Sequence, residues 1–282
     1  MVLIRIFSRI PFFVLYRISD FLYFLLFYVI RYRRKVVRQN MEKSFPELPL
    51  SDLRSLEAKF YRFFTDLVIE TIKCFTISEK EVRKRVSFIN PEVLEEPLNK
   101  GISVLVYVSH QGNWELLGHA AKLYFNFPLD ATYQKLENAF FNKAIYKMRT
   151  RFGVFLMEKL EVFRVFYARR DITRMIAMIA DQSPKKGENR IWTTFLNQET
   201  CFFQGTEKLA GKFHYPVFVT FMKQTKRGYY SLYLKEIKYS SQDEPGTITR
   251  KFSKMLEEQI REQPHTYLWT HKRWKIKKQK AN

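Results

Sequence analysis

A histidine and a glutamate separated by four residues are the clearest sign of chemistry in this sequence. They lie in the stretch Ser109-His110-Gln111-Gly112-Asn113-Trp114-Glu115. The apolar run at 102–108 predicts a buried strand before this stretch, and the apolar pattern at 113–124 predicts a helix after it. The sequence therefore puts His110 at the end of a strand and Glu115 in the first turn of a helix.

This arrangement fits acyl transfer to a hydroxyl group. His110 would act as general base and take the proton of an acceptor hydroxyl, which attacks an activated acyl carbon. Glu115 would hold the imidazole in the right tautomer and offset the charge it gains, as the orienting acid does in a serine hydrolase triad. Gly112 allows close approach of the backbone, and the helix N-terminus offers N–H groups to an oxyanion or a phosphate.

Two other interpretations of His110 stay open at this point. In the first, His110, Glu115 and His119 are metal ligands, since Glu115 and His119 are four apart on one helix face. No His-Glu-x-x-His motif supports this site, and the two cysteines, Cys74 and Cys201, are far apart, which also favours a reducing compartment. In the second, His110 is a structural residue whose ring is satisfied at a strand end.

The composition indicates a folded protein with anionic partners. The chain has 282 residues, of which 46% are hydrophobic, so it can bury a full core. Its 49 Lys and Arg outnumber its 28 Asp and Glu, which gives a net charge of +21. This charge favours lipid headgroups, nucleic acid or an acidic carrier protein. The aromatic content of 17% is typical of a protein at a membrane interface.

Residues 1–34 are predicted to form an N-terminal membrane anchor. The apolar stretch after Asp20 is too short to cross the hydrocarbon layer, but about twenty residues are available from Ile10 onward. Arg17 and Asp20 interrupt this run and are spaced to pair on a helix. No small-residue cleavage site follows, so we expect an uncleaved helix that either spans the membrane or lies in its interface. An amphipathic helix packed on its own domain is the alternative.

A basic cluster follows the apolar segment. It consists of Arg31, Arg33, Arg34, Lys35 and Arg38. Such clusters mark the cytoplasmic side of a membrane segment and suit an anionic membrane surface. We therefore expect residues 35–282 to form a catalytic domain on the cytoplasmic face. Nucleic acid is disfavoured as a partner because no binding module is recognisable.

The remaining pattern predicts an α/β fold with a central, mostly parallel or mixed sheet flanked by helices. Amphipathic spacing predicts a helix at 51–75, in a helical layer before the catalytic part, and Ser78 with Glu81 has the pattern of a capping box. Further strands are expected at 128–133, 154–157, 217–222 and 229–237. Further helices are expected at 138–151, 170–178, 206–213 and 247–261.

The motif around His110 resembles a known family. It is similar to the His-x4-Glu block of the late lipid A acyltransferases, the lauroyl- and myristoyltransferases of Gram-negative envelopes, within the glycerolipid acyltransferase-like superfamily. Further blocks resemble the family and follow in its order: Asn40 with Phe45-Pro46, Tyr133 with Asn138, Arg149 to Gly153, Asp181-Gln182, Thr206 with Leu209-Ala210, and Tyr267 to Lys275. Several ordered blocks are far harder to obtain by chance than one.

The resemblance implies an O-acyltransferase with His110 and Glu115 as its catalytic residues. It would move a fatty acyl chain from an acyl carrier protein thioester to a hydroxyl of a lipid A precursor, a glycolipid, at the inner membrane. No metal and no cofactor are expected. The substrate-binding residues would be Asn113, Arg149, Arg151, Asp181 and Arg273.

Four of these residues have more specific expected roles. Arg149 and Arg151 would contact phosphate or carrier groups, or stabilise the thioester oxyanion. Asp181 would position an arginine or the acceptor. Arg273, together with Trp269 and His271 on the same side of an extended segment, would close the pocket or face headgroups.

The sequence also departs from the family pattern. Ser183 stands where many members have a second Asp, Gln134 replaces a usual Arg, and segment 197–203 differs from the usual Phe-rich, Gly-containing loop. These differences bear on the substrate more than on the reaction. An acyltransferase acting on another glycolipid or on a lysophospholipid is therefore the alternative, and the sequence leaves open the chain length and the choice between acyl carrier protein and coenzyme A.

Overall fold

A seven-stranded sheet forms the centre of the computed structural model, which describes residues 2–184 and 189–278. The strand order is β1-β9-β8-β2-β5-β3-β4. The strands are β1 (Val86–Phe88), β2 (Val104–Val108), β3 (Leu129–Tyr133), β4 (Phe155–Glu158), β5 (Met175–Ile179), β8 (Val217–Lys226) and β9 (Tyr229–Ile237). Strands β8, β2, β5, β3 and β4 run parallel, and β9 with β1 runs the opposite way. The predicted mixed sheet is confirmed.

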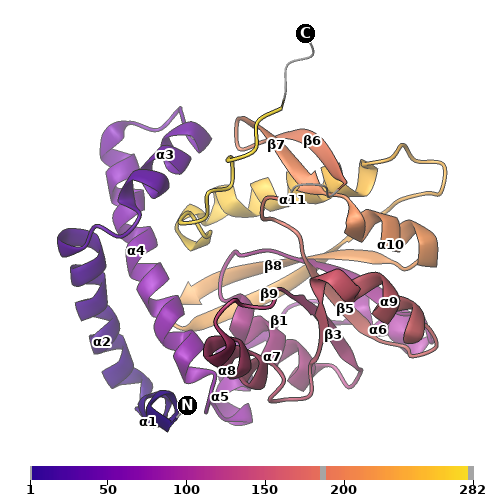
Figure 1. Ribbon diagram of the computed structural model, residues 1–282, viewed down its shortest axis with the longest axis horizontal. Coiled ribbons are helices and arrows are strands. Elements are labelled where there is room, and N and C mark those ends of the chain that lie inside the picture. The colour runs from indigo at the N-terminus through magenta and orange to yellow at the C-terminus, as the bar shows by residue number, and fades with distance from the viewer. Residues whose placement is uncertain (1, 185–188, 279–282) are drawn as a thin grey trace.

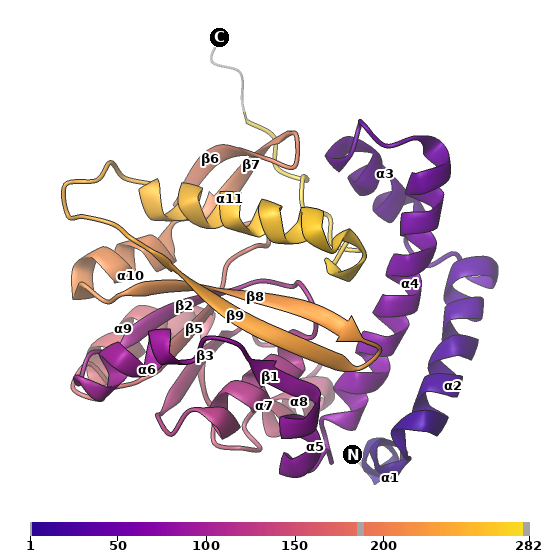
Figure 2. The same ribbon diagram turned by 180° about the vertical axis from the view of Figure 1, so that it is seen from behind.

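Helices cover both faces of this sheet (Figures 1 and 2). One face carries α10 (Gly205–Phe213), α11 (Thr247–Glu262) and the short turn η3 (Pro264–Thr266). The other face carries α5 (Glu79–Arg85), α6 (Glu92–Asn99) and α7 (Trp114–Tyr124). Near the β3–β4–β5 edge lie α8 (Ala139–Arg149), η2 (Lys159–Glu161) and α9 (Val162–Ala168). The expected flanking helices are confirmed, and Ser78 caps α5 by accepting a hydrogen bond from the Glu81 backbone.

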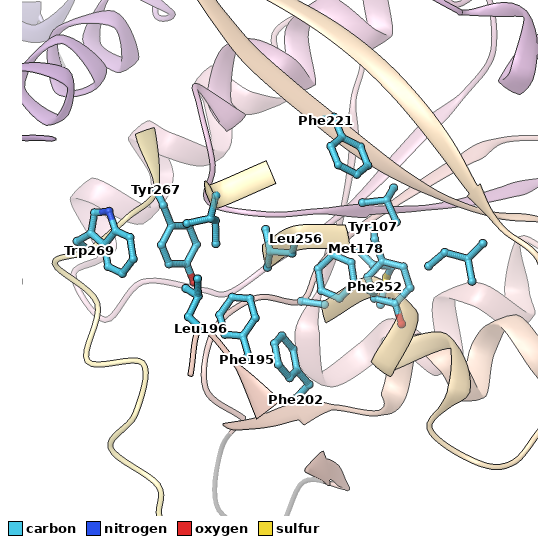
Figure 3. Close-up of a cluster of buried hydrophobic side chains, with 14 of the residues drawn as sticks. Tyr107, Met178, Phe195, Leu196, Phe202, Phe221, Phe252, Leu256, Tyr267 and Trp269 are labelled. Carbon is cyan, nitrogen blue, oxygen red and sulfur yellow. The ribbon is translucent and has the colours of Figure 1, made fainter. Parts of the chain in front are cut away.

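The alternation of side chains along β2 builds one core on each side of the sheet. Leu105 and Tyr107 join the core under α11, whereas the valines at 104, 106 and 108 join the core under α7. Figure 3 shows the first core, in which the Tyr107 ring stacks on Phe252 with centroids 4.3 Å apart. Each fully buried side chain of this kind contributes about 1.5–3 kcal/mol, so the strand that ends at His110 is rigidly held.

One predicted helix is wrong. Residues 170–178 were expected to be helical, but 175–179 form β5, which pairs with β2 and β3 and is largely buried. Methionine and alanine have good intrinsic helix propensity, and pairing inside a parallel sheet overrides that preference. The sequence reasoning also missed a separate hairpin of β6 (Arg190–Phe195) and β7 (Gln198–Phe203), which packs beside α11.

The N-terminal part forms a helical layer beside the sheet (Figure 1). It consists of α1 (Val2–Arg9), α2 (Phe12–Phe24), the π-helical turn η1 (Leu25–Val29), α3 (Arg34–Ser44) and the long α4 (Leu50–Lys73). In the described part of the chain, only the stretch from Phe12 to Val29 is long and apolar enough to cross a membrane by length and composition. Just 17% of this stretch is buried, so it is a candidate membrane anchor rather than a core helix.

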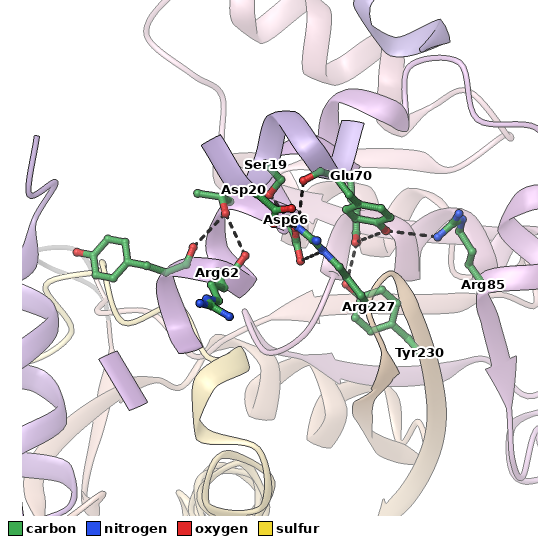
Figure 4. Close-up of polar contacts among 11 residues, drawn as sticks. Ser19, Asp20, Arg62, Asp66, Glu70, Arg85, Arg227 and Tyr230 are labelled. Atoms are coloured by element: carbon green, nitrogen blue, oxygen red, sulfur yellow. Dashed lines mark hydrogen bonds and ion pairs between the residues drawn. The ribbon is translucent and has the colours of Figure 1, made fainter. Parts of the chain in front are cut away.

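Polar contacts fasten α2 to the rest of the molecule (Figure 4). Asp20 binds Arg227, in the turn between β8 and β9, at 2.7 Å, rather than the predicted Arg17. Arg227 also binds Asp66 of α4 at 2.6 Å, and Asp66 accepts a hydrogen bond from Ser19 of α2 at 2.7 Å. The anchor helix therefore has a fixed orientation on the domain.

The basic cluster after the anchor is partly used inside the molecule. Arg34 and Arg38 both bind the buried carboxylate of Glu57, at 2.9 and 3.0 Å. Arg33 donates to the backbone oxygen of Thr270 at 3.0 Å. Arg31 and Lys35 are exposed and are available to a membrane surface.

Candidate active site

The loop between β2 and α7 presents His110 at the carboxyl edge of the sheet. The segment 266–268, near the C-terminus, forms two backbone hydrogen bonds with this loop. The Leu268 N–H donates to the His110 carbonyl at 3.1 Å, and the Gly112 N–H donates to the Thr266 carbonyl at 3.0 Å. Gly112 has φ +69°, and a Cβ there would lie 2.8 Å from the sulfur of Met222. Only glycine fits this turn without strain, which explains the glycine in the motif.

Asp181 holds the imidazole of His110. Its Oδ1 lies 2.8 Å from His110 Nδ1, and its Oδ2 accepts the His110 backbone N–H at 3.1 Å. Asp181 is 1% exposed. Burial opposes its charge, but the facing His110 outweighs burial, so the pKa of Asp181 lies below its usual value. A carboxylate on Nδ1 assigns the proton to Nδ1 and leaves Nε2 with a free electron pair, as a general base requires.

Two further residues lie beside the histidine: Gln182, which had no expected role, and His271, which was expected to close the pocket or face headgroups. Gln182 Nε2 is 3.2 Å from His110 Nε2, the atom that would accept the proton. His271 also lines the site, and burial lowers its pKa to about 4, which makes it a neutral ring at neutral pH. Both positions belong to blocks of the family resemblance, so the signal was present in the Asp181-Gln182 pair and in the closing block.

Glu115 binds Arg149 instead of His110. The pair is bidentate: Arg149 Nε donates to Glu115 Oε2 at 2.8 Å and Nη2 donates to Oε1 at 2.5 Å. Burial disfavours the charge on Arg149, but the carboxylate more than compensates, so the pKa of Arg149 is raised. Both Glu115 oxygens therefore face the guanidinium, and the carboxylate that contacts the His110 ring is that of Asp181.

A cavity of about 590 Å³ opens from His110. Its walls come from β3, α8, η2, α9, β5, β7 and α10, and most of the surface that they turn toward the cavity is apolar. The apolar part consists of Leu136, Ile145, Val162, Phe163, Met178, Ile179, Ala180, Phe203 and Leu209. The volume is within the range of about 300–1,000 Å³ found for ligand sites. A long apolar group can therefore reach the histidine from one side, while Arg149 lines the same cavity.

Comparison with known families decides what this site belongs to. A family model described as bacterial lipid A biosynthesis acyltransferase matches residues 1–276, almost the whole chain. The chain belongs to this family. A search among curated proteins found no match. Membership confirms the resemblance seen in the motif and makes the chain an acyltransferase of lipid A biosynthesis, with an acyl donor and a lipid acceptor.

In this lipid A acyltransferase, Asn113 stabilises the loop that carries His110. Its side chain is fully buried, caps α7 by accepting the Leu116 N–H at 2.9 Å, and donates to Glu70 at 2.7 Å. Glu70 also accepts hydrogen bonds from Tyr16 at 2.9 Å and Tyr230 at 2.7 Å, as Figure 4 shows for Tyr230. The structure therefore gives Asn113 a positioning role and does not bring it to the cavity wall, where substrate binding was expected.

The other two arginines predicted to bind substrate lie outside the main cavity. Arg273 is 2% exposed; it donates to the Cys201 carbonyl at 2.8 Å and packs on the Phe202 ring. Arg151 lies in a separate hollow, where it donates to the Ile77 carbonyl at 2.5 Å. Of the predicted arginines, the acyltransferase brings only Arg149 to His110.

The metal alternative finds no support in the arrangement of its proposed ligands. His119 is buried against the Phe152 ring, and Glu115 is engaged by Arg149. Across residues 2–184 and 189–278, no group of three or more His, Cys, Asp or Glu side chains is placed to hold a metal ion.

Proposed function

We propose that this enzyme transfers a fatty acyl chain from a thioester to a hydroxyl group of a lipid A precursor, with His110 as general base. One observation carries the proposal: an imidazole oriented by a buried carboxylate faces a cavity with mostly apolar walls. Such a cavity suits a fatty acyl chain, and a hydroxyl beside Nε2 would complete the reacting pair.

The reaction follows from the assigned tautomer. The acceptor hydroxyl displaces Gln182 from Nε2 and donates its proton there as its oxygen attacks the thioester carbon. The imidazolium that forms is stabilised by Asp181 at 2.8 Å. Collapse of the tetrahedral intermediate breaks the carbon–sulfur bond, and His110 returns the proton to the leaving thiolate. Acid–base catalysis of this kind is worth about 10²–10⁴ in rate.

Arg149 is the group best suited to the negative charge of the intermediate. Its bidentate bond to Glu115 uses Nε and Nη2, which leaves Nη1 to donate into the cavity. A guanidinium fixed in this way is preorganised for an oxyanion. In this proposal Glu115 acts on the reaction through Arg149, and Asp181 acts through His110.

We further propose acyl carrier protein as the donor and the cytoplasmic face of the inner membrane as the location. The net charge of +21 suits an acidic carrier and a phosphorylated acceptor. The apolar Phe12–Val29 helix and the exposed Arg31 and Lys35 support a membrane anchor with its basic side toward the cytoplasm. Residues 1–34 would then be the anchor and 35–282 the catalytic domain.

The test combines lipid analysis with a purified-enzyme assay. Mass spectrometry of lipid A should show one acyl chain fewer in cells without the protein, and His110→Ala should behave like the deletion. In vitro, the wild type should use acyl carrier protein thioesters as donors. Coenzyme A thioesters are assayed in parallel to compare the two donors. Unchanged lipid A, with transfer to a lysophospholipid or another glycolipid instead, would reassign the acceptor. Turnover by the His110→Ala variant would refute the catalytic base.

A further inference from the structure

A second hollow, about 470 Å³ in volume, lies beside the N-terminal helix and is lined by cations. Arg5 and Arg9 enter it from α1, Lys73 from the last residue of α4, and Arg151 from the turn after α8. Phe75 and Thr76 complete the lining, which contains no acidic residue. The hollow is separate from the cavity at His110, with which it shares no lining residue.

Two of the four cations of this hollow, Lys73 and Arg151, are held in place by backbone carbonyls, which do not neutralise their charge. Arg151 donates to the carbonyls of Ile77 and Cys74, and Lys73 donates to the Ile10 carbonyl at 2.9 Å. Among the ion pairs of the described residues, none includes Arg5, Arg9, Lys73 or Arg151.

The pKa values of two of these cations also indicate that positive charges gather in the hollow. Burial lowers the pKa of Lys73 and of Arg151, and the charge of Arg5 adds to the shift at Arg151. The acid that acts on Lys73 is Glu81, which is already paired with Arg85 at 3.1 Å. Four converging positive charges repel one another unless an anion joins them.

The position of α1 indicates where that anion comes from. Leu3 and Ile6 are 80% and 58% exposed; Leu3 projects from the side of α1 away from Arg5 and Arg9, and Ile6 lies between that side and Arg9. An amphipathic helix of this kind lies in the membrane interface with its apolar side in the lipid. Because α2 begins at Phe12, directly after α1, the cationic side of α1 would lie at the depth of the lipid headgroups.

We propose that this hollow binds the phosphomonoester headgroup of a membrane lipid. A phosphomonoester carries a charge of about −1.5 to −2 at pH 7 and three acceptor oxygens, which match several converging cations better than a carboxylate or a phosphodiester does. Guanidinium groups bind phosphate in a bidentate manner, and Thr76 holds α1 against the hollow through Ser8 at 2.7 Å. The proposal is independent of the catalytic function, since no step of catalysis is needed for binding.

The test measures binding to the full chain in nanodiscs of phosphatidylcholine. Three ligands are titrated in separate calorimetric experiments: dihexanoylphosphatidic acid, inorganic phosphate and dihexanoylphosphatidylglycerol. The double variant Arg5→Gln/Arg9→Gln should bind phosphatidic acid about 25-fold more weakly, since each basic residue near an anionic headgroup contributes about 1 kcal/mol. Lys73→Gln, from the other wall, should weaken binding about fivefold.

The matched control is Arg54→Gln/Lys59→Gln, which removes two exposed cations of α4 that do not line the hollow. It should bind phosphatidic acid as the wild type does. Equal weakening in both double variants would show diffuse attraction and overturn the site. Inorganic phosphate binding as tightly as phosphatidic acid would overturn a lipid ligand, and equally tight binding of phosphatidylglycerol would overturn the preference for a phosphomonoester. Circular dichroism of each variant separates lost binding from lost folding.

Discussion

Asp181→Asn should abolish most of the activity while leaving the fold intact. The backbone N–H of His110 donates to Asp181 Oδ2, so the carbonyl oxygen of an asparagine must occupy that position. Its NH₂ group then faces His110 Nδ1, where a hydrogen bond acceptor stood 2.8 Å away. The imidazole is thereby forced to carry its proton on Nε2, and the base that should receive the hydroxyl proton is lost.

The size of the effect follows from what the base contributes. Losing general base catalysis should lower kcat by about 10²–10⁴, which corresponds to about 3–5 kcal/mol of barrier. KM for the acyl donor should change little, because Asp181 is buried behind the histidine and does not line the cavity.

The assay is turnover of an acyl carrier protein thioester with a lipid A precursor in detergent micelles. Asp171→Asn is the matched control, because Asp171 is exposed and far from His110 in the sequence and its pair with Arg170 is loose at 3.8 Å. If Asp181→Asn keeps kcat within threefold of the wild type, His110 does not depend on this carboxylate, and the assignment of Nε2 as the base fails.

Three other outcomes are expected. Glu115→Gln and Arg149→Gln should each lower kcat, and the double variant should be little worse than either, which kinetics of the double-mutant cycle will check. Ile145→Trp narrows the cavity and should lower kcat/KM for the longest accepted chain by about tenfold or more, as product masses will show. Burial raises the pKa of Glu70, so its contribution to stability is full below its unfolded pKa of about 4.3 and is lost as pH rises through the folded pKa. Glu70→Gln should thus gain stability relative to the wild type as pH rises from about 4, as thermal unfolding at a series of pH values will test, and a pH-independent difference would contradict the ionisation of Glu70.

The sequence predicted the parts of the site that local pattern controls. The apolar run before His110 and the apolar pattern at 113–124 are short-range signals, and they correctly indicated a buried strand followed by a helix. The glycine at 112 was rightly expected to allow a close backbone approach, here against Met222.

These short-range signals could not identify Asp181 as the carboxylate that contacts His110. Asp181 is 71 residues from His110 and reaches it because β5 lies next to β2 with their carboxyl ends together. Residues 170–178 were predicted to be helical, which concealed that neighbouring strand. Glu115 is close in sequence, but its place in the first turn of α7 directs it toward α8 and Arg149. Spacing along the chain therefore found His110 and Glu115, whereas the carboxylate that contacts the imidazole follows a distant strand.

Three distant segments converge on the loop that carries His110, and this accounts for a site whose motifs spread over most of the chain. Thr266 and Leu268, near the end of the chain, form backbone hydrogen bonds with the loop. Asp181, just after β5, accepts a hydrogen bond from the His110 backbone. The third segment is the N-terminal helical layer. Tyr16 of α2 and Asn113 of the loop both donate hydrogen bonds to the carboxylate of Glu70 in α4. If the Phe12–Val29 stretch anchors the chain as proposed, its hydrogen bond to the side chain that also holds the His110 loop would fix the mouth of the cavity relative to the bilayer. A lipid acceptor that stays in the membrane would then present its hydroxyl to His110 in a single orientation.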